Sequence, residues 1–374
     1  MPKCVEQKSI LIENSTWNNV GDGFYQFPIY YLLKSMYGNV SNVAMIDGPI
    51  NRAFRLNSPS KKRFKNNAFN ISKIYDGNIY IFSGPIFRAG FLENYASFIE
   101  EIKRKGADYL ILSSHSSLEE NSHELSKIIS FLQEYPPLGL SSRDRYTFDL
   151  LNPFIKNCYD GLCCAFYSYI LCPLPKLKSS NKYITLSFYK NFEPNIYIKI
   201  ENEEIVNINI QPYRLEKYSL FWKYLRHFEF LRNVPSSYDS YEIIRPNHGI
   251  GTSFINVDFS KPNSYLSFNP LSYLSLYQGT SLTISDRVHS CVVTLAAGKP
   301  VVFYSNYIKS NDRRPQIFER APISCDPRTG AYVADLTKIE SEFHLFRKWI
   351  ERTLVELISV DKNKNDSIVA IHLS

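Results

Sequence analysis

Cysteine is scarce in this sequence, and its spacing is not that of a metal site or a disulfide framework. The 374 residues include seven Cys, and no two of them form a CxxC pair. The histidines likewise lack the spacing of a metalloprotease. These absences argue against a zinc site and a disulfide-stabilised fold, so we expect no bound metal and a reducing, cytoplasmic environment.

Long apolar runs are also missing. No stretch approaches the roughly 18 apolar residues that a membrane-spanning helix needs. The start, MPKCVEQKSILIENS, lacks the charged region and long apolar core of a signal peptide. We therefore expect a cytoplasmic protein whose association with a membrane, if any, is peripheral.

Acidic residues are absent from one basic segment, residues 51–70, which reads NRAFRLNSPSKKRFKNNAFN in a chain of net charge +7. The simplest interpretation is a solvated loop. The alternative is a peripheral contact with an anionic membrane that carries a lipid-linked substrate. No nucleic-acid-binding motif is near this segment, and the many Tyr and Phe residues are spread along the whole chain, so we expect no nucleic acid partner.

The pattern of apolar segments predicts an α/β fold with two domains, in agreement with the chain length. Strand-like segments such as residues 78–84 and 108–114 alternate with amphipathic helices such as residues 122–134. Residues 197–210 alternate like a hairpin, which departs from this order.

The periodic pattern is interrupted at residues 171–182, LCPLPKLKSSNK, which we interpret as the domain boundary. We predict an N-terminal α/β domain over residues 1–175 and a C-terminal α/β domain over residues 180–350. Residues 351–374 are the end of a helix and a tail. Two Rossmann-like domains of this kind face a cleft, which is the default ligand site.

Ionisable residues lie next to each other at the start of an otherwise apolar stretch, residues 284–303, which reads ISDRVHSCVVTLAAGKPVVF. Residues 281–304 predict a strand, a helix that ends before Gly298, and a second strand, with Ser285 or Asp286 as the helix N-cap. Arg287 and His289 then lie at the carboxyl end of a strand and the amino end of a helix. Open α/β sheets bind ligands there, and free backbone N–H groups attract anions.

Three other polar segments follow predicted strands, and each has a plain structural interpretation. NNVGDG, residues 18–23, is typical of a turn. Arg143 and Asp144 in SSRD would form an ion pair at a helix start, and His248 in IIRPNHG would be a loop histidine.

Taken together and in order, these segments resemble the polysaccharide pyruvyl transferase family. The resemblance rests on NNVGD (residues 18–22), SSRD (141–144), YDGLCCAF (159–166) and SDRVH (285–289) with the later GKP (298–300). NPLSYLSLY, residues 269–277, also looks like the family. The resemblance implies two domains of the glycosyltransferase-B kind and phosphoenolpyruvate as co-substrate, with no resident cofactor. It also implies transfer of the pyruvyl group, as a ketal, onto two hydroxyls of a sugar in a polysaccharide or lipid-linked glycan.

The resemblance also implies residue roles. Arg287 and His289 would bind the donor and serve in catalysis. From their loop positions in the opposite domain, rather than from the resemblance, we expect Asp22 and Asp144 to orient or deprotonate the acceptor hydroxyls. The expected donor-binding residues are Ser285, Arg287, Val288, His289 and Arg245. The expected acceptor-binding residues are Asn19, Gly21, Asp22, Arg143, Asp144 and His248.

The reaction itself calls for these residue types. Phosphoenolpyruvate carries a carboxylate and a phosphate, which arginine binds well, and the proton transfers suit a histidine. The second donor cation stays open among Lys190, Arg245, Arg313 and Arg314.

Two other classes of function stay open. A glycosyltransferase with the same fold would use a nucleotide-sugar donor, with the Arg-His pair on its diphosphate. A non-catalytic glycan- or nucleic-acid-binding protein would use the basic segment as its contact surface.

Overall fold

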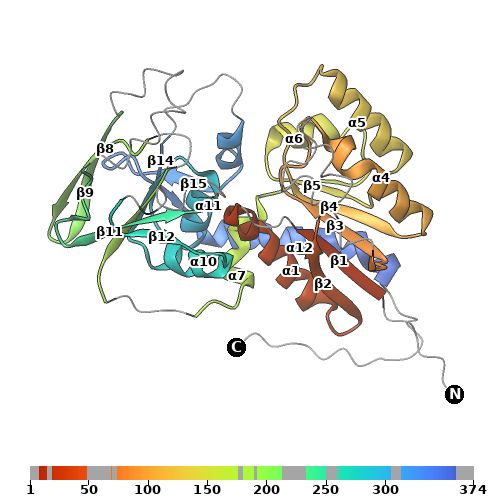
Figure 1. The fold of residues 1–374 in the computed structure, drawn as a ribbon, viewed down its shortest axis with the longest axis horizontal. Coiled ribbons are helices and arrows are strands. Elements are labelled where there is room, and N and C mark those ends of the chain that lie inside the picture. The colour runs from red at the N-terminus through yellow and green to blue at the C-terminus, as the bar shows by residue number, and fades with distance from the viewer. Residues whose placement is uncertain are drawn as a thin grey trace.

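The computed structural model shows an α/β protein built from two units, each with a central sheet (Figure 1). It describes residues 8–14, 19–48, 69, 74–175, 180–188, 192–212, 233–249, 259, 261–304 and 313–358. The expected fold class is confirmed. Of the basic segment 51–70, only Phe69 belongs to the described residues, so the predicted membrane contact lies outside them.

The first unit holds a six-stranded parallel sheet in the order β2-β1-β3-β4-β5-β6. Its strands are β1 (Lys8–Asn14), β2 (Ser41–Asp47), β3 (Ile79–Ser83), β4 (Asp108–Ser114), β5 (Leu140–Ser142) and β6 (Cys158–Asp160). Its main helices are α1 (Gly23–Tyr37), α4 (Phe91–Arg104), α5 (His123–Glu134) and α6 (Arg145–Leu151). The apolar residues of α4 and α5 recur at helical spacing and are buried, which explains why these segments form helices against the sheet.

The second unit holds a mixed sheet in the order β10-β11-β7-β13-β14-β16-β15, with β12 beside β11. Its strands are β7 (Tyr183–Ser187), β10 (Ser237–Tyr238), β11 (Tyr241–Asn247), β12 (Ser264–Leu266), β13 (Leu282–Ser285), β14 (Val301–Phe303), β15 (Ile323–Cys325) and β16 (Tyr332–Ala334). The central strands β11, β7, β13 and β14 are parallel, and the edges are antiparallel. Helices α10 (Pro270–Gly279) and α11 (Val288–Ala296) pack beside this sheet.

The predicted hairpin is also confirmed. Strands β8 (Asn195–Glu201) and β9 (Glu204–Gln211) pair antiparallel as a separate two-stranded sheet. Isoleucines from both strands pack on the apolar cluster of the second sheet, which explains why an inserted ribbon stays attached to this unit.

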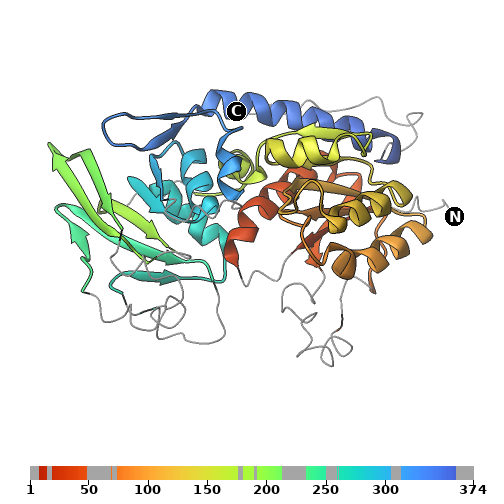
Figure 2. The same cartoon turned by 90° about the horizontal axis from the view of Figure 1, so that it is seen from above.

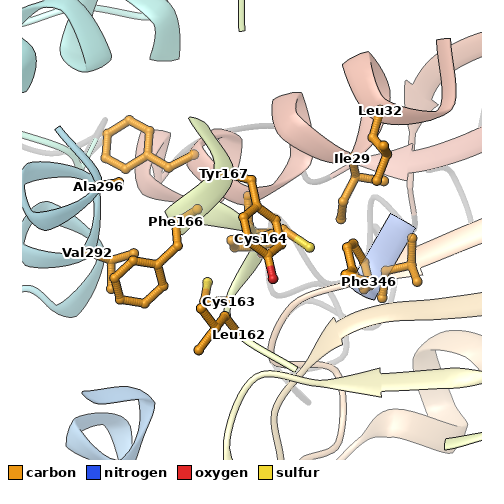
Figure 3. Close-up of a cluster of buried hydrophobic side chains, with 14 of the residues drawn as sticks. Ile29, Leu32, Leu162, Cys163, Cys164, Phe166, Tyr167, Val292, Ala296 and Phe346 are labelled. Atoms are coloured by element: carbon orange, nitrogen blue, oxygen red, sulfur yellow. The ribbon is translucent and has the colours of Figure 1, made fainter. Parts of the chain in front are cut away.

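One apolar core passes from the first unit into the second. It joins α1 and the 3-10 helix η4 (Cys164–Tyr167) to α11 and to the long helix α12 (Leu336–Ile358). Figure 3 labels ten of the side chains in this core. Helix α12 starts at the second unit and runs along the first (Figure 2). There Trp349 Nε1 donates to Asn157 Oδ1 at 2.8 Å, and the rings of Phe346 and Tyr167 stack. The two units are therefore held together by burial of apolar surface, so the residues at their junction have a defined geometry.

Pro28 lies in the interior of α1 rather than in its first turn, where a proline is tolerated. Proline has no N–H, so the carbonyl of Phe24, one turn earlier, loses its helical donor. The hydroxyl of Ser168, in the short helix α7 (Ser168–Leu171), lies 3.1 Å from that carbonyl and 2.8 Å from the carbonyl of Ala165, so its proton is shared between the two and partly replaces the lost donor. The helix continues because a neighbouring element partly supplies the missing hydrogen bond.

The segment around Arg287 forms the predicted strand, helix and strand as β13, α11 and β14, and Gly298 follows the helix with φ of 71°. The predicted N-cap was wrong, however. Arg287 occupies that position, and the Ser285 hydroxyl accepts the Arg287 N–H at 2.9 Å instead. Ser285 also donates to the carbonyl of Ser187 on β7, so it ties the turn to the sheet rather than capping the helix.

Among the helices that the structure describes, none combines the length and the apolar character that crossing a bilayer requires.

Candidate functional site

The loop after β1 reaches across to the second unit. Val20 N–H donates to the carbonyl of His248 at 2.9 Å, and Asn19 and Gly249 form an isolated antiparallel bridge. A Cβ built on Gly21 would lie 3.5 Å from Nδ1 of His248 and 3.7 Å from Nδ1 of His289. The loop that carries three expected acceptor residues therefore lies directly against two expected ligand-binding histidines.

Arg143 comes from the opposite unit and meets His289. It follows β5, it is only 5% exposed, and its Nη1 lies 3.2 Å from Nε2 of His289. None of the ion pairs found within the described part of the chain involves Arg143. A buried guanidinium without a carboxylate partner is unfavourable, and an anionic ligand would neutralise it. Arg143 is an expected acceptor-binding residue, and the structure places it in contact with His289, an expected donor-binding residue.

His289 is a neutral imidazole in this arrangement. Burial lowers its pKa well below the usual value, and the charges of Arg143, His115, Arg287 and Arg314 lower it further. Because a guanidinium can only donate, Nε2 of His289 must accept from Arg143, which leaves the proton on Nδ1. The ring also packs against Tyr25, with a centroid distance of 5.3 Å.

Asp144 does not face the junction as an open carboxylate. It is 1% exposed, its Oδ1 accepts the N–H of Thr147 as the N-cap of α6, and its Oδ2 lies 2.8 Å from Nδ1 of His115. Burial alone would raise the pKa of Asp144, but the hydrogen bonds from His115 and Thr147 outweigh it, so the pKa is lowered. The expected acceptor contact of Asp144 is therefore replaced by contact with His115.

His248 starts a chain of hydrogen bonds through the second unit. Its Nε2 lies 2.7 Å from Tyr277 Oη, which donates to Ser290 Oγ at 3.1 Å. Ser290 donates to Ser187, and Ser187 donates to the carbonyl of Pro246. Because each hydroxyl has one proton, His248 must donate from Nε2, which leaves its Nδ1 as the acceptor on the side of Gly21. Burial and the charge of Arg287 lower the pKa of His248 well below its usual value.

A further group of arginines enters from the second unit on the turn η7 (Arg314–Phe318) and the residue before it. Arg313 donates to the carbonyl of Leu118 at 2.7 Å, and its guanidinium lies 3.6 Å from the ring centre of Tyr146. Arg313 is thus held on the first unit, and the neighbouring Arg314 contributes to the positive field at His289.

Arg245 serves the fold instead of the donor. It is 6% exposed, and it forms a two-pronged ion pair with Glu193 at 2.9 Å and 2.8 Å. Its remaining N–H groups donate to the carbonyls of Pro235 and Pro262. These contacts occupy the guanidinium, so we remove Arg245 from the expected donor-binding residues.

Three other expected site residues differ in how far their side chains are available to a ligand. The side chain of Val288 is buried in the shared core, so only its backbone could meet a donor. Ser285 shapes the turn before Arg287. Asp22 is half-buried at the end of η1 (Val20–Asp22) and accepts from Asn19 Nδ2 at 3.4 Å.

His115 is the site residue that the sequence analysis missed. It follows β4 within the polar run Ser113–Ser117, SSHSS, directly after the buried strand. The other polar segments were recognised by the same position after a strand, and this signal would have found His115 as well.

Within the described residues, no group of His, Cys, Asp and Glu side chains is arranged to hold a metal ion. The residues present suit an anion, because the arginines and histidines supply N–H donors and positive charge.

The model of the polysaccharide pyruvyl transferase family matches residues 19–307. A search of curated proteins finds no match.

The chain is similar to solved structures at low identity. One is a functionally uncharacterized protein from Klebsiella pneumoniae, with 14% identity over 86% of this chain and 92% of that one and a TM-score of 0.42. Another is a putative UDP-N-acetylglucosamine 2-epimerase from Listeria monocytogenes, with 8% identity over 96% and 93% and a TM-score of 0.47.

Proposed function

The chain belongs to the polysaccharide pyruvyl transferase family, and from its site we propose the reaction that it catalyses. It transfers the pyruvyl group of phosphoenolpyruvate onto two hydroxyls of one sugar in a polysaccharide or glycan, forms a pyruvate ketal and releases phosphate.

The observation that carries this proposal is the buried Arg143 guanidinium, which contacts the neutral ring of His289 and forms no ion pair among the described residues. Arg287, from the opposite unit, adds a second guanidinium that lowers the pKa of both His248 and His289. Phosphoenolpyruvate carries two anionic groups on one carbon atom, and two arginines from two directions match them. Arg314, in the same field, is our choice for the further cation that the sequence analysis left open.

The reaction requires a balanced movement of protons, and His289 is suited to part of it. A sugar hydroxyl adds to the enol carbon and loses its proton, while the methylene group gains one. The bond to the phosphate oxygen then breaks, and the second hydroxyl adds and loses its proton. Burial and the arginine charges together keep His289 neutral, and a bound anion offsets the arginine charges, so the pKa of His289 rises and the ring can protonate the methylene.

On the acceptor side, we propose that Asp22 orients sugar hydroxyls, together with the loop residues Asn19 and Gly21. Asp22 is half-buried in the loop that contacts the two histidines, so its carboxylate is near the reacting group without being enclosed. A carboxylate accepts hydrogen bonds from sugar hydroxyls in this position.

The test is turnover with phosphoenolpyruvate and a panel of nitrophenyl glycosides of common hexoses and N-acetylhexosamines. We expect phosphate release together with a glycoside that is heavier by one pyruvate ketal. Arg287→Ala should abolish both, whereas Arg328→Ala should not, because Arg328 is 79% exposed in a surface turn. Transfer of sugar from a nucleotide sugar, without any product from phosphoenolpyruvate, would replace this proposal by the glycosyltransferase alternative.

A further inference from the structure

The pair His115–Asp144 has no role in the donor site, although both residues are almost completely buried at its edge. Asp144 uses one oxygen to cap α6 and the other to bind Nδ1 of His115. Neither oxygen is left for a substrate, so Asp144 acts on the reaction only through His115.

The contact with Asp144 fixes the tautomer of His115. Since the pKa of Asp144 is lowered, its carboxylate is ionised and accepts, and Nδ1 of His115 must carry the proton. Nε2 then has a free lone pair. In the described part of the chain, Nε2 has no hydrogen-bond partner, and it is not among the fully enclosed polar atoms.

The charges that face His115 keep this lone pair available. Burial lowers its pKa most, Asp144 opposes this, and Arg143 and Arg313 lower the pKa further. His115 in turn lowers the pKa of His289, so the two rings share one field although they come from opposite units. A neutral imidazole with a carboxylate on Nδ1 and an open Nε2 is the arrangement of a general base.

The backbone conformation just before His115 also supports a functional role for this residue. Ser113 has φ of 53°, a left-handed conformation that is rare outside glycine. Two hydrogen bonds hold it there, from Ser113 N–H to Ser141 Oγ at 2.8 Å and from Cys164 N–H to Ser113 Oγ at 3.1 Å. Backbone strain that neighbouring contacts maintain is common beside functional side chains.

We propose that His115 is the general base for the acceptor hydroxyl and that Asp144 is its positioning residue. The proton of the attacking hydroxyl moves to Nε2 of His115 as the sugar oxygen bonds to the enol carbon of phosphoenolpyruvate. The imidazolium then gives this proton to the departing phosphate, which restores the neutral ring. The two histidines thus divide the work, with His115 on the acceptor and His289 on the donor.

The inference rests on the proposed function, and its test separates the two. In His115→Gln, phosphoenolpyruvate should bind as in the wild type by calorimetry, while kcat falls by roughly 10²- to 10⁴-fold, the contribution of one general base. The decline of kcat/KM for the sugar toward low pH, which reports protonation of His115, should disappear in the variant. His123→Gln is the matched control, because His123 is an exposed histidine at the start of α5 and should leave turnover unchanged.

Asp144→Asn is the sharper variant, because asparagine still caps the helix and the protein should fold. Its amide would donate to Nδ1 and move the ring proton to Nε2, which removes the base. Nitrogen-15 spectra of the labelled histidine ring should show the proton on Nδ1 in the wild type and on Nε2 in this variant, without any acceptor present.

Turnover of His115→Gln at the wild-type rate, or a wild-type ring protonated at Nε2, would overturn the inference while leaving the donor site intact. Failure of the wild type to bind phosphoenolpyruvate would instead refute the proposed function.

Discussion

Arg143 Nη1 and His289 Nε2 lie 3.2 Å apart, although 146 positions separate the two residues in the sequence and each belongs to a different unit. The contact leaves a buried cation against a neutral ring, which is a poor arrangement for stability and a good one for binding an anion. In the proposed reaction, His289 would therefore need a bound anion before it could serve as an acid.

Replacing Arg143 should therefore weaken the binding of phosphoenolpyruvate without lowering the stability of the fold. In Arg143→Met, we expect the affinity for phosphoenolpyruvate to fall by about 10- to 100-fold, since a hydrogen bond to a charged group contributes about 1.5–3 kcal/mol. The thermal unfolding midpoint should stay the same or rise, because the substitution removes an unpaired buried charge. Calorimetry and thermal melts measure the two quantities.

Arg245→Met is the matched comparison, because Arg245 is equally buried but paired with Glu193. Breaking this buried pair leaves the Glu193 carboxylate with Lys261, whose Nζ lies 3.3 Å away, so this variant should lose unfolding free energy, up to about 3–5 kcal/mol. The folded fraction should still bind phosphoenolpyruvate. The opposite pattern, with Arg143→Met unstable and Arg245→Met unable to bind, would contradict both assignments.

Stability should fall as the pH is lowered through the titration range of histidine. Burial lowers the pKa of His115, and it lowers the pKa of His248 and His289 well below the usual value. The unfolded chain, with histidine pKa values of about 6.5, then binds protons that the folded chain does not. The contribution of these histidines to stability is therefore constant above pH ~6.5 and decreases below it, and saturating phosphoenolpyruvate should reduce this decrease. Thermal melts from neutral to mildly acidic pH measure it.

The buried carboxyl of Glu13 has the opposite effect on how stability depends on pH. Burial raises its pKa well above the usual value, so its contribution to stability is lost as the pH rises. The melts are best done in Glu13→Gln, in which only the histidines titrate in this range. A flat pH profile of stability in that variant would show that the three rings are charged in the folded protein.

Two glycines test the packing behind His289. Gly84 and Gly106 both have positive φ, of 82° and 75°. A Cβ on Gly84 would lie 2.2 Å from Tyr25 Oη, whereas a Cβ on Gly106 would meet nothing within 4 Å. Gly106→Ala should cost about 1 kcal/mol through backbone strain alone. Gly84→Ala should cost more and also lower turnover, because it displaces the ring that packs on His289.

Denaturant unfolding and turnover of both variants measure these effects. Equal losses of stability, with full turnover in Gly84→Ala, would show that the Tyr25 contact does not support the site.

Much of the fold could be predicted because it depends on local sequence patterns. The burial of α4 and α5 on one face and the turn after α11 follow from spacing and from glycine. The continuation of α1 through Pro28 is not evident from the sequence, because the hydroxyl that reaches the Phe24 carbonyl belongs to Ser168, far along the chain.

The site could be predicted only as a set of segments. Position after a strand identified Arg143, Asp144, Arg287 and His289, and the same signal was available for His115. The side chains that these residues contact were not predictable, because contacts between the two units depend on how the shared core orients the two sheets. The ion pair of Arg245 could not be predicted for the same reason, since nothing local indicates that Glu193 neutralises it.

The most direct test of the account is calorimetric titration of the protein with phosphoenolpyruvate, beside Arg287→Ala and against UDP-N-acetylglucosamine. We predict saturable binding of phosphoenolpyruvate that is lost in the variant. Proton uptake on binding should appear as a dependence of the measured heat on the buffer, because the anion raises the pKa of His289. Binding of the nucleotide sugar, with none of phosphoenolpyruvate, would contradict the account.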